Sequence, residues 1–278
     1  MRIDRFSDPA AFARAAAPLL DADAARHTLA QTALDRMRHG IGSPALLLTV
    51  TRADAVVGAV LREQGRPAAV SALPPGCAAA VEAVAGGADP ELSGCSGPVV
   101  EAEAFAAAHV ARTGLGVEVA MRLRLFRLVT LIRPVGVPGC ARTAGPVDVD
   151  VVAELVAAFA AEAIRALARP SDPRPGLVES MRLGTGHLLW EVEGRPVAYA
   201  AARRPVAGMS RIGPVYTPPV HREHGYGSAV TAAATAWAAR AGAREVVLFT
   251  DLANPVSNAI YPRLGYRSVH DALELRFG

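Results

Sequence analysis

Residues 213–229 read GPVYTPPVHREHGYGSA and contain the pattern Arg-x-x-Gly-x-Gly, which runs from Arg222 to Gly227. The apolar residues before Pro218 predict a strand, and the alanine-rich residues after Gly227 predict a helix. Gly225 and Gly227 leave backbone N–H groups uncovered where that helix begins, at the positive pole of its dipole. The pattern therefore favours a phosphate-binding site, although two glycines between a strand and a helix are also common in plain turns.

Residues 246–266 read VVLFTDLANPVSNAIYPRLGY and predict a buried strand followed by a short helix. Pro255 suits the first turn of that helix, and Gly265 suits its end. Considered separately, Asn254 is an ordinary N-cap residue and Tyr261 an ordinary amphipathic core residue. Neither residue alone indicates a function.

Taken together, the two segments resemble the signature segments of the GNAT superfamily of acyl-CoA-dependent N-acyltransferases. Arg222–Gly227 is similar to the family's pyrophosphate loop, Arg/Gln-x-x-Gly-x-Gly/Ala. Asn254–Tyr266 is similar to the family's segment Asn-x-x-Ala/Ser-x-x-x-Tyr-x-x-x-Gly-Phe/Tyr. The resemblance covers roughly residues 140–278 and implies an α+β fold, in which helices flank a mixed, mostly antiparallel sheet.

The resemblance also implies a site for acetyl-CoA. In this family the strand before the loop splays from its neighbour, and the pantothenate arm of CoA lies between the two strands. Val215 and Thr217 would be backbone partners of that arm, Asn254 would bond the pantetheine chain, and Tyr261 would lie beside the thioester sulfur. Backbone N–H groups of residues 223–228 would hold the pyrophosphate. The implied acyl-CoA-binding residues are Val215, Tyr216, Thr217, Arg222, Glu223, His224, Gly225, Tyr226, Gly227, Ser228, Asn254, Ser257, Asn258 and Tyr261.

Elementary chemistry gives catalytic roles to some of these residues. When an amine attacks a thioester, negative charge develops on the carbonyl oxygen, and the N–H that the resemblance places at Val215 stabilises it. A phenol with a pKa of about 10 stays protonated at neutral pH, so Tyr261 can protonate the leaving thiolate. The strand before the loop lacks the glutamate that the family often uses as general base. Asp251, at the end of the central strand, is our candidate base, whereas Glu191 and Glu193 fit surface charges better.

Four landmarks recur in the same order in both halves of the chain, which favours an internal repeat over a chance likeness of alanine-rich segments. The N-terminal copy lacks the arginine and the Gly-x-Gly pattern, and Val110 stands where Tyr261 would be expected. The paired landmarks are residues 46–61 with 188–202, 73–75 with 217–219, 105–114 with the helix ending at Gly265, and 119–131 with the closing strand at 266–277. We therefore expect tandem GNAT-like domains, with a degenerate domain over 1–133, a linker and first strand region over 134–147, and an acetyl-CoA-binding domain over 148–278.

Composition excludes several classes of protein. Hydrophobic types make up 51% of the 278 residues and charged types 20%, so the chain can bury a core and is not a disordered, highly charged chain. All 29 basic residues are arginine, and the net charge of +3 is spread evenly, which disfavours a nucleic-acid partner. Cys77, Cys95 and Cys140 are widely spaced, and His221 and His224 lack metal-ligand spacing, so we expect free thiols and no metal. No apolar run approaches the roughly 20 residues of a membrane span, so we expect a cytoplasmic protein without a membrane partner.

The sequence thus predicts an enzyme that transfers an acetyl or other acyl group from acetyl-CoA to a primary amine by direct attack in a ternary complex. The alternative is a non-catalytic acyl-CoA-binding or sensing module, because binding needs only the loop whereas turnover also needs Tyr261. The acceptor, which could be a small molecule, a peptide amine or a protein lysine, and the existence of a homodimer stay open.

Overall fold

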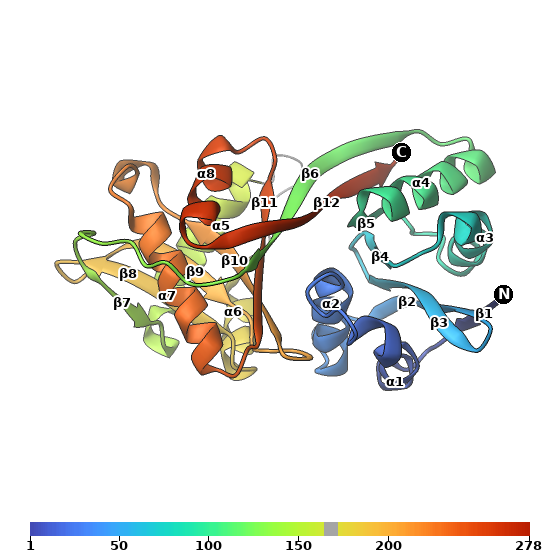
Figure 1. Cartoon of the computed structure of the whole chain (residues 1–278), viewed down its shortest axis with the longest axis horizontal. Coiled ribbons are helices and arrows are strands. Elements are labelled where there is room, and N and C mark those ends of the chain that lie inside the picture. The colour runs from blue at the N-terminus through green and yellow to red at the C-terminus, as the bar shows by residue number, and fades with distance from the viewer. Residues whose placement is uncertain (164–171) are drawn as a thin grey trace. The chain divides into compact units, whose positions relative to one another are not determined.

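The computed structural model describes residues 1–163 and 172–278, which form two compact units (Figure 1). Unit 1 comprises Met1–Leu125, Asp251–Ala253 and Val269–Gly278. Unit 2 comprises Phe126–Thr250 and Asn254–Ser268. Neither unit is a continuous piece of chain, because short segments from the second half of the sequence belong to unit 1.

The chain passes twice through one order of elements: a strand, two helices, three strands, a helix, a strand, a helix and a strand. The first pass consists of β1 (Arg2–Arg5), α1 (Pro9–Leu20), α2 (Thr28–Arg38), β2 (Pro44–Arg52), β3 (Ala55–Glu63), β4 (Ala68–Ser71), α3 (Ala78–Ala88), β5 (Gly94–Pro98), α4 (Val99–Thr113) and β6 (Val117–Leu128). The second pass consists of β7 (Cys140–Thr143), α5 (Val149–Ala163), α6 (Arg174–Arg182), β8 (Gly186–Val192), β9 (Arg195–Ala202), β10 (Met209–Tyr216), α7 (Tyr226–Arg240), β11 (Glu245–Asp251), α8 (Pro255–Arg263) and β12 (Tyr266–Phe277).

Strand pairing repeats as faithfully as element order. The first four strands of each pass pair antiparallel in sequence order, from β1 to β4 and from β7 to β10. The next pair is parallel in both passes, β4 with β5 and β10 with β11. The predicted α+β fold with a mixed, mostly antiparallel sheet is confirmed, and so is the internal repeat.

In unit 1, helices cover both faces of the sheet because neighbouring residues of its central strands point to opposite sides. Leu46 and Leu48 of β2 pack with residues of α3 and α4, such as Val81 and Phe105. Leu47, between them, packs with residues of α1 and α2. This explains why β2 is an almost continuous apolar run rather than an alternating one.

Unit 2 has the same layered core. Leu188 of β8 packs in the cluster that includes Val230 of α7 and Tyr261 of α8. Leu189, the next residue, packs in the cluster that contains residues of α5 and α6. The helices α7 and α8, which carry the two signature segments, therefore lie on one face of this sheet.

We expected β6 and β12, the last strands of the first and second pass, each to complete the sheet of its own half of the chain. The structure shows a different arrangement. Residues 272–276 of β12 pair antiparallel with β5 inside unit 1, where Leu273 and Leu275 are buried in the core. Conversely, Phe126 of β6 is buried in the core of unit 2. Each unit therefore receives its closing strand segment from the other half of the sequence. The expected linker, residues 134–147, lies within unit 2 and contains β7.

Four further details concern the helix α7, the helix α5, the cysteines and membrane-spanning helices. Within α7, Val230 and Ala234 are buried and Trp237 is half-buried, whereas Ala241 lies beyond the helix end at Arg240 and is exposed. The spacing of Leu155, Phe159, Ile164 and Leu167 predicts one apolar helical stripe, of which Ile164 and Leu167 lie outside the described residues. The three cysteines are free, and among the described helices none is long and apolar enough to cross a membrane.

Candidate functional site

The strands β10 and β11 separate part of the way along β10. They pair in parallel from Met209–Glu245 to Ile212–Leu248, and no described pair follows although β10 continues to Tyr216. Over the same residues β10 shifts its register against β9, with Ile212 opposite Ala202 but Val215 opposite Ala200. Such a bulge bends a strand and redirects its backbone groups. The half-buried Val215 therefore lies where β10 has left β11, as the resemblance implied.

The phosphate-loop segment, residues 222–228, leads directly into α7. Glu223 and Gly225 have left-handed backbone conformations, with φ of +68° and +80°, and Gly225 is the N-cap of α7. The N–H of Ala229 donates to the carbonyl of Gly225 at 3.0 Å, so the N–H groups of residues 226–228 precede the first helical bond. No side chain caps this helix end. These donors at the positive end of a helix of 15 residues fit a pyrophosphate.

The two glycines of the loop have different neighbours. A Cβ at Gly225 would lie 3.1 Å from Cγ2 of Val137, and a Cβ at Gly227 would lie 3.2 Å from Oγ1 of Thr217. Val137 belongs to the proline- and glycine-rich segment, which the Nε1–H of Trp190 holds by donating to the Pro138 carbonyl at 2.8 Å. We expected this segment to be a linker, but its residue Val137 borders the loop.

The side chain of Arg222 has hydrogen bonds with Thr217, Glu162 and Tyr216. Its Nε donates to the Thr217 carbonyl at 3.0 Å, and its Nη2 lies 2.8 and 2.7 Å from the two carboxylate oxygens of Glu162 in α5. The hydrogen bonds that Arg222 donates to Glu162 raise the pKa of Arg222. His224 stacks on Tyr226 with ring centroids 5.4 Å apart.

The side chains of the remaining loop residues vary in exposure. Glu223 and His224 are exposed, Ser228 is half-buried and Tyr226 is buried. Tyr216 packs edge-on against Phe159 and has a side-chain hydrogen bond with Arg222.

Asn254 does cap the helix α8, as its residue type suggests. Its Oδ1 accepts a hydrogen bond from the N–H of Ser257 at 3.1 Å, which fixes the side chain and leaves the amide nitrogen as a donor. Ser257 and Asn258 are half-buried on this helix. The cap and a donor role toward a ligand are therefore compatible.

Tyr261 lies in the core beside aromatic rings. Its centroid is 6.1 Å from those of both Phe126 and Tyr266, and the residue is 7% exposed. Burial raises the pKa of Tyr261 to about 12, and a hydrogen bond with Ser257 opposes that rise. The phenol is therefore protonated throughout the physiological pH range.

The structure groups Asp251 with unit 1, whereas the other candidate residues belong to unit 2. Its Oδ1 accepts from the N–H of Ala253 at 2.8 Å. Of the other acids, Glu191 is bound by Arg142 at 2.8 Å. Among the described residues, no group of three or more His, Cys, Asp and Glu side chains could hold a metal ion, and the absence of a metal stays a prediction.

The equivalent region of unit 1 lacks the features found in unit 2. The strand β4 pairs with β3 without a register shift, and a Cβ at Gly97 of β5 would collide with the carbonyl oxygen of Val70 in β4. These two parallel strands are therefore in close contact near the end of β4. The helix α3 begins after Cys77, without a glycine cap.

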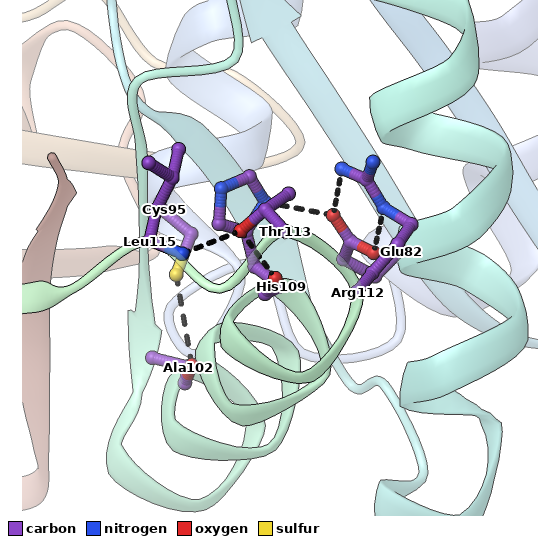
Figure 2. A network of polar contacts seen from close by, with 7 residues as sticks. All are labelled: Glu82, Cys95, Ala102, His109, Arg112, Thr113 and Leu115. Carbon is purple, nitrogen blue, oxygen red and sulfur yellow. Dashed lines mark hydrogen bonds and ion pairs between the residues drawn. The ribbon is translucent and has the colours of Figure 1, made fainter.

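A buried polar network joins α3 to α4 in unit 1 instead (Figure 2). Glu82 is 1% exposed and accepts hydrogen bonds from Arg112 at 2.8 Å, while its Oε1 lies 2.7 Å from Nδ1 of His109. Burial opposes ionisation of Glu82, but the hydrogen bonds from Arg112 and His109 outweigh it and lower its pKa. His109 also stacks on Phe277 of β12 at 3.9 Å. No local sequence pattern marks this network, because Glu82 lies 27 residues before His109.

Comparison with known proteins yields one family and one fold. Residues 159–266 match the model of the acetyltransferase (GNAT) family. A search of curated proteins finds no match. A GCN5-related N-acetyltransferase from Kribbella flavida is 20% identical with a TM-score of 0.61, over 92% of this chain and 95% of that one.

A second similar structure extends the likeness to the whole chain. A tandem GNAT protein from the clavulanic acid biosynthesis pathway is 16% identical with a TM-score of 0.57, over 100% of this chain and 98% of that one. At such identities these neighbours show the fold, while the family match covers the segments that carry both signature motifs. Residues 159–266 therefore match the GNAT family of acetyltransferases, and the chain as a whole has the fold of two GNAT domains in tandem.

Proposed function

We propose that unit 2 binds acetyl-CoA and transfers its acetyl group to a primary amine by direct attack in a ternary complex. The family and the fold support acyl transfer in general. The observation that carries the finer proposal is the separation of β10 from β11 beyond Ile212, next to the uncapped N-terminus of α7. The pantothenate arm of the substrate would lie between the separated strands. Its pyrophosphate would bind the N–H groups at the start of α7.

In this proposal most of the binding groups are backbone groups. The N–H groups of residues 226–228 bind the pyrophosphate, and the backbone of Val215 and Thr217 binds the pantothenate arm. The amide nitrogen of Asn254 donates to a carbonyl of the pantetheine chain, because its oxygen is already used for the helix cap. Glycine is required at position 225 by the left-handed backbone and the nearby Val137.

For the chemical step, the N–H of Val215 stabilises the charge that develops on the thioester oxygen. The phenol of Tyr261 donates a hydrogen bond, and then its proton, to the departing sulfur. Its pKa of about 12 keeps the proton available. Because a thiol has a pKa of about 8.5, below that of this buried phenol, proton transfer is uphill and occurs only together with cleavage of the C–S bond, after which the tyrosinate regains a proton from solvent. Positioning of amine and thioester supplies much of the remaining rate enhancement.

Calorimetric titration with acetyl-CoA tests the binding site. We expect one molecule per chain, and a large loss of affinity in Gly227→Val, because the side chain obstructs the N–H groups at the start of α7. The fold should survive, since a Cβ at this position meets only the movable hydroxyl of Thr217, at 3.2 Å. Undiminished affinity in the folded variant would refute the pyrophosphate assignment, and two molecules per chain would indicate a site in unit 1.

A screen of amines with acetyl-CoA, read by thiol release, tests the activity. Release with at least one small-molecule, peptide or protein amine is expected. Binding of acetyl-CoA without thiol release in the presence of every amine would favour the non-catalytic sensing module.

A further inference from the structure

Glu162, near the end of α5, binds the arginine of the phosphate-loop segment. Its two carboxylate oxygens lie 2.8 and 2.7 Å from Nη2 of Arg222. Neither signature segment contains Glu162, and the proposed binding and transfer of the acetyl group do not use it. Its position nevertheless brings a negative charge to the loop whose N–H groups would receive an anion.

Arg222 does not depend on Glu162 for its orientation. The Nε of Arg222 is anchored on the carbonyl of Thr217 at 3.0 Å, whereas Glu162 contacts only Nη2. Both side chains are also well exposed, Arg222 by 42% and Glu162 by 51%. An exposed ion pair of this kind is weak and easily exchanged for another anion.

We propose that Glu162 competes with the pyrophosphate of CoA for Arg222 and thereby limits the affinity of unit 2 for CoA and its thioesters. This inference rests on the proposed function. When the pyrophosphate binds, Arg222 exchanges the carboxylate for phosphate oxygens, and the released carboxylate still repels the ligand. A pyrophosphate outcompetes Glu162 because it carries more charge and offers more acceptor oxygens. The competition favours release of the CoA product.

The test compares the affinities of CoA and pantetheine, which lacks the pyrophosphate, by calorimetry at low and at high salt. In Glu162→Gln, CoA should bind about five-fold more tightly at low salt. This factor corresponds to the repulsion energy of two unit charges about 4 Å apart in water. The gain should shrink at high salt because salt screens exposed charges. Pantetheine affinity should not change. The control Glu154→Gln alters an exposed residue of the same helix two turns earlier and should leave both affinities unchanged.

The outcomes separate this inference from the proposed function. If the parent protein binds CoA, and Glu162→Gln binds it equally or more weakly, competition is refuted while the proposed function stands. An equal gain for pantetheine also refutes it, because the effect would not involve the pyrophosphate. If the parent protein binds neither CoA nor acetyl-CoA, the proposed function itself fails. Thermal unfolding of each variant verifies that the affinities refer to folded protein.

Discussion

Tyr261 is a buried tyrosine whose proton the proposed reaction uses. In Tyr261→Phe the aromatic ring stays in the core, but the proton donor is lost. We expect kcat for acetyl transfer to fall by about 10²–10⁴-fold, the usual size of general acid assistance. The Kd for acetyl-CoA should change little, because the backbone of the loop is intact. Steady-state kinetics with an accepted amine and calorimetry measure the two quantities.

Tyr266→Phe is the matched control for this prediction. Its hydroxyl lies 2.6 Å from Oγ1 of Thr235, which itself donates to a helix carbonyl, so Tyr266 is the donor and has a structural role. The variant should lose some stability and keep its kcat. An equal kcat in Tyr261→Phe and the parent would show that another group protonates the sulfur, or that the chemical step is not rate-limiting.

His187 makes the stability of the protein dependent on pH. Ser180 donates to the Leu177 carbonyl at 2.9 Å, so its oxygen accepts from Nε2–H of His187 at 2.8 Å. Nδ1 of His187 then accepts from the hydroxyl of Tyr199 at 2.7 Å, an arrangement that needs the neutral imidazole. Burial, followed by the charge of Arg203, lowers the pKa of His187 from 6.5 to about 4.

The sign of the pH effect follows from the proton uptake of the unfolded chain. Between pH 6.5 and pH 4 the unfolded imidazole is protonated and the folded one is not. The free energy of unfolding should therefore decrease as the pH is lowered through this window, and the decrease should reach about 3 kcal/mol at pH 4. In His187→Gln, urea unfolding at a series of pH values should show a shallower slope. An unchanged slope in His187→Gln would contradict the assignment.

At the scale of elements, the contact between α3 and α4 depends on Glu82. In Glu82→Gln the shape is kept, but the charge that Arg112 and His109 bind is lost. We expect the free energy of unfolding at neutral pH to fall by about 2 kcal/mol, in the range for hydrogen bonds to charged groups. Because the pKa of Glu82 is lowered on folding, its contribution is present above its ordinary pKa near 4.5 and is lost as pH falls through the folded value.

Asp4→Asn supplies the comparison for Glu82→Gln. Asp4 forms an ion pair with Arg2 in which the arginine side chain is 70% exposed, so its loss should cost less than about 1 kcal/mol. Urea denaturation measures both variants. Equal losses would show that the network in Figure 2 does not hold the two helices together more firmly than a surface pair does.

At the scale of the whole molecule, the exchanged strands β6 and β12 make the two halves of the chain dependent on each other. Residues 1–133 lack Leu273 and Leu275, which are buried in the core of unit 1. Residues 134–278 lack Phe126, which is buried in the core of unit 2. We expect neither half, expressed alone, to show a cooperative thermal transition, and the two halves expressed together to form a folded complex. A cooperative transition in either isolated half would contradict this expectation.

The sequence by itself determined the elements and their order. Alternating and continuous apolar runs predicted the strands β8 to β11, and Gly225, Asn254 and Gly265 marked where α7 and α8 begin or end. These features were predictable because they depend on backbone preferences and on residues a few positions apart. The same local signals revealed the repeat and the two signature segments, and the roles of the individual site residues remain predictions.

Tertiary structure alone decided which distant residues meet. The exchange of β6 and β12 joins residues more than 100 positions apart, and a strand pattern does not say which sheet edge a strand completes. The pairing of Glu162 with Arg222 and the position of Val137 beside Gly225 have the same origin. Such contacts depend on packing between residues that are distant in the sequence, so neither hydrophobic periodicity nor motif spacing predicts them.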